Sequence, residues 1–78
     1  MNWTEYIEAK PGVITGKPAI KGTRIGVDLI LEKMAYGDTI EDIQAAYPHL
    51  TLESIRACLA YATAMIRNEE TYFLTPAA

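Results

Sequence analysis

A run of basic residues with no acidic residue among them is the part of this sequence best suited to binding an anion. Residues 10–27 contain four cations, Lys10, Lys17, Lys21 and Arg24, and no Asp or Glu. Because clustered cations attract phosphate groups and acidic proteins, this segment suits either kind of partner. The alternative is a solvated loop that only keeps the protein soluble.

Four residues are predicted to contact DNA if the chain binds it. Three stand in the basic segment and one on a helix further along: Lys17, Lys21, Arg24 and Arg56. Lysine and arginine contact phosphates, and arginine also reads guanine in the major groove. A local role competes for Arg24, because an ion pair with Asp28 or Asp42 would pin this segment to the rest of the fold.

Residues that commonly carry out catalysis are sparse. The chain has one cysteine, Cys58, and one histidine, His49, so it can form neither an internal disulfide nor a four-ligand zinc site. His49 follows Pro48 and is interpreted as a turn residue, and Cys58 as a small buried hydrophobe. The adjacent carboxylates at 41–42 and 69–70 would face apart on a helix. We therefore predict that the chain is not an enzyme and binds no metal or cofactor.

Glycine and proline interrupt the first third of the chain, which is therefore predicted to form an extended arm. The apolar and β-branched residues between them suit short strands of a small irregular sheet, at 13–14, 19–20 and 23–25. From Asp28, the predicted N-cap, apolar residues at helical spacing predict a first helix over 28–36. Gly37 suits its left-handed end.

Two further helices have start signals. Thr39 and Asp42 have the spacing of a capping box and Pro48 stops the helix that follows, so a second helix is predicted over 40–46. Thr51 caps a third helix. Its predicted core-facing residues recur every three or four positions: Leu52, Ile55, Leu59, Ala62 and Ile66. Its predicted solvent-facing residues are Glu53, Ser54, Arg56, Ala57 and Ala60.

These elements predict one mainly α domain over residues 1–78. A Gly/Pro-rich arm with short β-strands at 1–27 precedes a three-helix, helix-turn-helix-like bundle at 28–66, and a tail follows at 67–78. Half of the residues are apolar, which is enough for one small core. The net charge is −3 and the pI about 4.9, whereas DNA-binding domains are usually basic. Strong autonomous DNA recognition is therefore not expected.

Two surfaces suit protein partners. Bulky apolar residues cluster in the tail, where they either fold back on the core or bind another protein: Tyr72, Phe73 and Leu74. Another set forms a ridge along the third helix that a second helix could approach closely: Ala57, Tyr61 and Ala64. This ridge predicts a homodimer, although in so small a core the same residues could face the first helix.

The string GKPAIKGTRI at residues 16–25 is distinctive. With the landmarks that follow it, the chain resembles the family named domain of unknown function 433. These landmarks are Ile30-Leu31, Gly37, Tyr47-Pro48-His49-Leu50 and Tyr61-Ala62. The resemblance covers about residues 7–66. Such proteins resemble VapB-type antitoxins with a homeodomain-like helical core, which are often encoded beside a PIN-like nuclease toxin.

This resemblance implies an antitoxin of a type II toxin-antitoxin pair, which neutralises a PIN-like toxin and could bind its own promoter. It transfers no catalytic residue. The competing prediction is a small protein-interaction or dimerisation module that never contacts DNA. No apolar stretch approaches the ~20 residues of a membrane span, and no secretory leader is apparent, so a cytoplasmic protein is expected.

Overall fold

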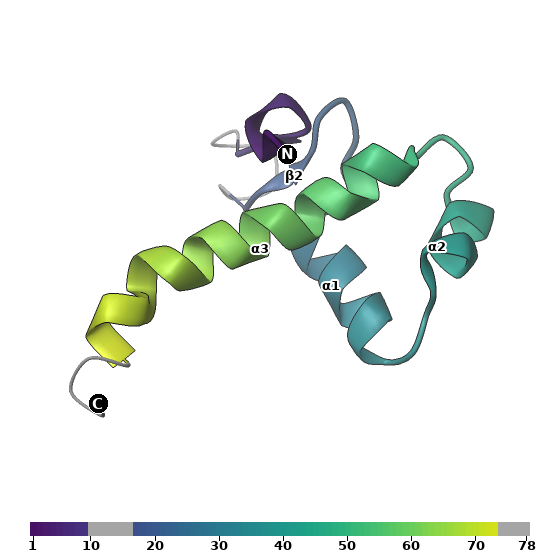
Figure 1. The fold of residues 1–78 in the computed structure, drawn as a ribbon. Helices are drawn as coiled ribbons and strands as arrows, with labels where there is room; N and C mark the ends of the chain where they lie inside the picture. The colour runs from purple at the N-terminus through teal and green to yellow at the C-terminus, as the bar shows by residue number, and fades with distance from the viewer. Residues whose placement is uncertain (10–16, 74–78) are drawn as a thin grey trace.

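The computed structural model describes residues 1–9 and 17–73, with side chains as far as residue 68. In chain order its elements are η1 (Trp3–Glu5), β1 (Ile7–Glu8), β2 (Ala19–Ile20), α1 (Val27–Ala35), α2 (Ile40–Ala46) and α3 (Leu52–Phe73). Figure 1 shows α3 as a long rod across the molecule, with η1 on one side and α1 on the other. The predicted class is confirmed: the described chain is mainly helical, with three α-helices and a short antiparallel sheet.

A two-stranded sheet holds the arm together. β1 pairs antiparallel with β2, and Ile7 stands opposite Ile20. On the other side of β2, the Ile20 amide donates a hydrogen bond to the Ile25 carbonyl (3.0 Å). Residues far apart in sequence are thereby fixed next to the start of α1.

The strands predicted in the arm were partly correct. Residues 19–20 form β2, whereas residues 13–14 lie outside the described residues. Residues 23–25 form no strand, because the chain turns at residues 21–22 and bends at Thr23, whose hydroxyl donates to the Ile20 carbonyl (2.8 Å). The strand β1 was not predicted, since two residues show no periodicity.

Helix α1 begins at Val27, and its N-cap is Gly26 rather than the predicted Asp28. Gly26 has an extended backbone (φ −71°) and no side chain to accept a capping hydrogen bond. Asp28 stands instead in the first turn, where the helix dipole favours an anion. At the other end, Gly37 has φ 104°, so the predicted left-handed conformation is confirmed.

Side-chain caps fix the starts of α2 and α3, as predicted. The Thr39 hydroxyl accepts from the Asp42 amide (3.0 Å), and the Asp42 carboxylate accepts from the Thr39 amide (2.8 Å). At α3, the Thr51 hydroxyl accepts from the Ser54 amide (3.1 Å). Both caps satisfy amides that have no partner within the helix itself.

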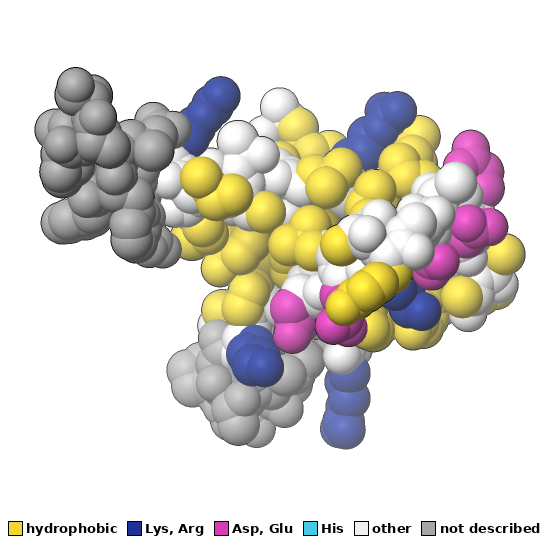
Figure 2. Space-filling model, turned by 90° about the horizontal axis from the view of Figure 1, so that it is seen from below, with side chains coloured by type: hydrophobic (Ala, Val, Ile, Leu, Met, Phe, Trp, Pro, Cys, Tyr) yellow, Lys and Arg dark blue, Asp and Glu magenta, His cyan; other side chains and the backbone are white. Residues whose placement is uncertain are grey.

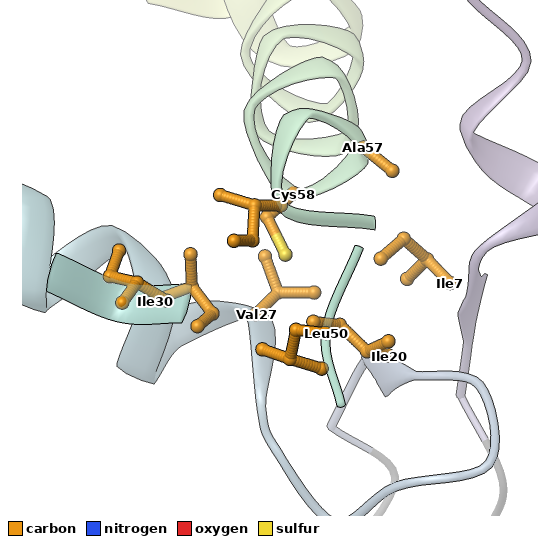
Figure 3. Packing of buried hydrophobic residues seen from close by; sticks show 9 residues of the cluster. Ile7, Ile20, Val27, Ile30, Leu50, Ala57 and Cys58 are labelled. Atoms are coloured by element: carbon orange, nitrogen blue, oxygen red, sulfur yellow. The ribbon is translucent and has the colours of Figure 1, made fainter. Parts of the chain in front are cut away.

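One core of buried apolar side chains joins all three α-helices to the sheet (Figure 3). Its members are Ile7, Ile20, Val27, Ile30, Ile43, Leu50, Ile55, Ala57 and Cys58. Figure 3 shows Ala57 and Cys58 extending from α3, with Val27 and Ile7 beneath the helix. The arm is therefore part of the domain rather than an appendage.

Helix α3 buries a different face from the predicted one. Ile55 is fully buried as expected, but Leu59 and Ile66 are 39% and 65% exposed. Ser54 and Ala57, predicted to face solvent, are buried. The reason is that η1 and β1 pack against α3 and cover the side that carries Ala57, which helical periodicity alone does not reveal.

Candidate nucleic-acid and protein interfaces

The three described cations of the arm are exposed. Lys17, Lys21 and Arg24 all point into solvent, as an anion-binding arm requires. The Lys17 ammonium lies 3.8 Å from the Asp28 carboxylate, but both side chains are largely solvated, so this ion pair contributes little stability. The ion pair predicted for Arg24 does not form: among the described side chains, Arg24 pairs with neither Asp28 nor Asp42.

The structure places the arm beside the corner that joins α2 to α3. A groove of about 300 Å³ lies between them, lined by Tyr6 and Lys21 from the arm and by His49 and Thr51 from the corner. Glu5 also lines this groove, so it holds a carboxylate as well as an ammonium group. It therefore has no strong preference for an anion.

Sequence reasoning missed this groove, although its prediction of His49 as a turn residue is confirmed. His49 is exposed in the corner, and its ring meets the Tyr47 ring edge to face with 6.5 Å between centroids. Nothing in the sequence links residues 5–6 with the corner. That proximity depends on the packing of η1 and β1 against α3.

The first turns of α2 and α3 carry more acid than base. Glu53 and Arg56 on α3 are exposed, and so are Glu41 and Asp42 on α2. Figure 2 shows acidic side chains gathered at the end of the molecule where α2 lies. The Thr39 amide and hydroxyl hold the pKa of Asp42 below its ordinary value, which keeps that carboxylate charged. This end would repel phosphates, so Arg56 stands in an unfavourable setting for reading DNA.

The ridge predicted for dimerisation is largely used within the chain. Ala57 is completely buried in the core, and Tyr61 is half-buried with its ring edge to face against Trp3, 4.9 Å between centroids. Ala64 is half-buried one turn further along. Ala57 is therefore enclosed by its own chain and the arm partly covers Tyr61, while the homodimer itself stays a prediction.

The far end of α3 carries the residues predicted to bind a partner. The helix continues to Phe73, past the predicted end at residue 66, so Tyr72 and Phe73 are helical while Leu74 lies outside the described residues. Figure 1 shows no other described helix or strand beside this end. Ile66 is 65% exposed there.

Among the described residues, no helix has both the length and the apolar character of a membrane span.

The described part of the chain holds neither a cluster of metal-ligating side chains nor an accessible cysteine. No three His, Cys, Asp or Glu side chains gather there in a way that could hold a metal ion. The Cys58 thiol is buried, and burial raises its pKa to about 11. The reactive thiolate is thus scarce at neutral pH.

Comparisons with known proteins agree with this fold. A family model described as "Protein of unknown function (DUF433)" matches residues 7–62. The crystal structure of a DUF433 member from Anabaena variabilis superposes with a TM-score of 0.74 at 29% identity, and the match covers 85% of this chain. The uncharacterized protein y4eO of Sinorhizobium fredii is 33% identical over 60 residues, 77% of this chain.

This chain is shorter than both relatives. It matches 27% of the length of the Sinorhizobium protein and 65% of the Anabaena chain. Neither relative carries the name of an enzyme.

Proposed function

This chain belongs to the DUF433 family, and we propose that it is the antitoxin of a type II toxin-antitoxin pair that binds and neutralises a PIN-like nuclease toxin in the cytoplasm. The observation that carries the proposal is the end of α3, which extends to Phe73 with no described element beside it. An exposed helix with apolar side chains suits insertion into a groove of a partner protein. In this role the chain acts by occupying the toxin and catalyses nothing itself.

The contact with the toxin centres on the last turns of α3. Ile66 presents an apolar side chain to solvent, and two aromatic residues, Tyr72 and Phe73, follow about two turns later. Large apolar and aromatic side chains supply most of the free energy at protein interfaces.

Co-expression with the neighbouring reading frame tests this proposal. We expect a stable complex and rescue from growth arrest, and we expect Tyr72→Ala/Phe73→Ala to abolish both while leaving the melting temperature unchanged. Tyr36→Ala is the matched control, because Tyr36 is an aromatic residue at the end of α1 that is 85% exposed. Failure of the wild type to bind any neighbouring gene product would refute the antitoxin role.

Binding of the chain to its own promoter is the second part of the proposal. The exposed cations Lys17, Lys21 and Arg24 would contact phosphates, and Arg56 would add a contact to a base. We expect each removed charge to reduce the slope of log affinity against log salt by about one unit per protomer. An unchanged slope for Lys17→Ala/Lys21→Ala would discard this part.

The acidic end of the molecule favours a second candidate, a protein-interaction module that binds no DNA. Glu41, Asp42 and Glu53 are exposed around the helix-turn-helix corner, and the pI is about 4.9. Titration of promoter DNA at low salt separates the two candidates, since electrostatic binding is strongest there. Absence of binding under these conditions supports the module.

A further inference from the structure

The groove between the arm and the corner of α2 and α3, which we call the arm–corner groove, takes no part in the proposed contact with a toxin. Its volume of about 300 Å³ is at the lower end of the range for small-molecule sites. The lining residues that matter here come from both sides of it: Glu5, Tyr6, Ile20 and Lys21 from the arm, and His49 and Thr51 from the corner. The groove therefore exists only because the arm is packed against the helices.

Two opposite charges line the arm–corner groove without neutralising one another. Glu5 and Lys21 are both exposed, and within the described residues neither of them takes part in an ion pair. The Lys21 amide donates to the Tyr6 carbonyl (2.8 Å), which fixes the backbone of Lys21 next to the residue that follows Glu5. A ligand that carries both a carboxylate and an ammonium group would satisfy both charges at once.

Apolar surface and a free hydroxyl group complete the lining. Ile20 is 4% exposed and Tyr6 is half-buried, so the groove has an apolar part that is held by the core. The Thr51 hydroxyl accepts from the Ser54 amide (3.1 Å), and among the described residues its own proton has no acceptor. It is therefore available to donate to a ligand. Apolar surface with a few polar groups is typical of small-molecule sites.

We propose that the arm–corner groove binds a free α-amino acid with an apolar side chain. The Lys21 ammonium and the Thr51 hydroxyl bind its carboxylate, and the Glu5 carboxylate accepts hydrogen bonds from its ammonium group. Tyr6 and Ile20 contact its side chain. A simple anion would meet the like charge of Glu5, and a simple cation that of Lys21, so a zwitterion fits better than either. This inference concerns the free protein and depends on neither a toxin nor DNA.

Three probes of similar size separate the two charged contacts. L-leucine carries both groups, leucinamide lacks the carboxylate, and 4-methylpentanoate lacks the ammonium group. In NMR titrations of the full chain, leucine should shift the amide signals of Lys21 and Thr51 saturably. Because the groove is small and open, we expect a Kd of about 1 mM. Each of the other two probes should bind about fivefold more weakly, since it loses one charged contact.

Removal of each charge from the protein identifies its partner on the ligand. Lys21→Gln should weaken leucine about fivefold and leave leucinamide unchanged, because leucinamide has no carboxylate to lose. Glu5→Gln should weaken leucine by a similar factor without weakening 4-methylpentanoate. Both residues are exposed, so both variants should fold, which circular dichroism checks.

The controls are Lys17→Gln and Glu53→Gln, which remove exposed charges that do not line the groove. Both should bind leucine like the wild type. The proposal would be overturned by the absence of saturable shifts at tens of millimolar leucine, or by equal affinity for all three probes. It would also be overturned if Lys21→Gln weakened leucine and leucinamide alike, or if the controls lost leucine binding.

Discussion

The Trp3 ring meets the Tyr61 ring edge to face, with 4.9 Å between centroids and 85° between planes. The two residues join the first described element to the middle of α3, and both are half-buried against the core. Aromatic pairs in this geometry add to the free energy gained by burying the rings. The N-terminal arm is therefore held in place by its start as well as by its strands.

Removal of this ring should destabilise the whole domain. We expect Trp3→Ala to lower the free energy of unfolding by about 2 kcal/mol, less than for a fully buried tryptophan because Trp3 is only half-buried. In a domain of this size that corresponds to a fall in melting temperature of roughly 10 °C, measurable by circular dichroism. Tyr61→Phe keeps the ring contact and should melt near the wild type. Equal melting temperatures for Trp3→Ala and wild type would show that the arm is not docked.

The capping box of α2 should make stability depend on pH at the acidic end. The Thr39 amide and hydroxyl stabilise the charged Asp42 carboxylate, so its pKa lies below the ordinary 3.8. This contribution is present above that value and is lost as the pH falls through the lower pKa of the folded state. We expect Asp42→Asn to be less stable than wild type at neutral pH and the difference to shrink below about pH 3.8.

Chemical denaturation of both proteins at several pH values measures that difference. Glu41→Gln is the matched control, because it removes a charge from the same helical turn but leaves the Thr39–Asp42 hydrogen bonds intact. A difference that stays constant from neutral to acidic pH would contradict the role of the charged carboxylate. If Glu41→Gln loses the same pH dependence, the dependence comes from the net charge of this helical turn rather than from the capping box.

A side chain at Gly37 should destabilise the end of α1. Its amide donates to the Met34 carbonyl (3.1 Å), and the amide of Asp38 donates to the Lys33 carbonyl (2.9 Å), which is the Schellman arrangement at the end of α1. At φ 104° any L side chain is strained, although the space around it is open. We expect Gly37→Ala to lower the free energy of unfolding by about 1 kcal/mol, measured by thermal unfolding.

The control for Gly37 is a substitution at an equally exposed position with ordinary backbone. Tyr36→Ala adjoins it and removes a solvated side chain, so its melting temperature should change little. If Gly37→Ala and Tyr36→Ala have the same melting temperature, a side chain at the positive φ of Gly37 does not destabilise the domain.

Local sequence signals were enough to predict the bounds of α2 and both ends of the loop that joins α1 to α2. Thr39, Asp42 and Pro48 set the bounds of α2, and Gly37 marked the end of α1, because caps and breakers act on neighbouring residues. The distinctive string at 16–25 was also enough to identify the family, which the match over residues 7–62 confirms.

Packing between residues far apart in sequence determined which side of α3 is buried and which residues line the groove, and local sequence patterns do not reveal either. The buried side of α3 shifted toward Ala57 because η1 and β1 pack there, and no local pattern connects them to α3. The extension of α3 had a signal that went unused, since no glycine or proline occurs between Ile66 and Pro76. The groove beside His49 likewise depends on that docking, so its lining could not be read from spacing.

Cys58 should be unreactive in the folded protein and should make stability fall at alkaline pH. Burial raises the pKa of its thiol from 9.0 to about 11, so the folded state holds the proton more tightly than the unfolded state. The resulting stability is fully present below pH 9.0 and is lost as the pH rises toward about 11. We expect the difference in free energy of unfolding between wild type and Cys58→Ala to shrink over this window. Taking this difference cancels the titration of tyrosines and lysines, because both proteins share it.

The same burial should protect the thiol from chemical modification. A thiol reagent at neutral pH should modify Cys58 only as fast as the protein unfolds, and addition of urea should accelerate the modification. Rapid modification without denaturant would show instead that the thiol is accessible and that its burial in the core is incorrect.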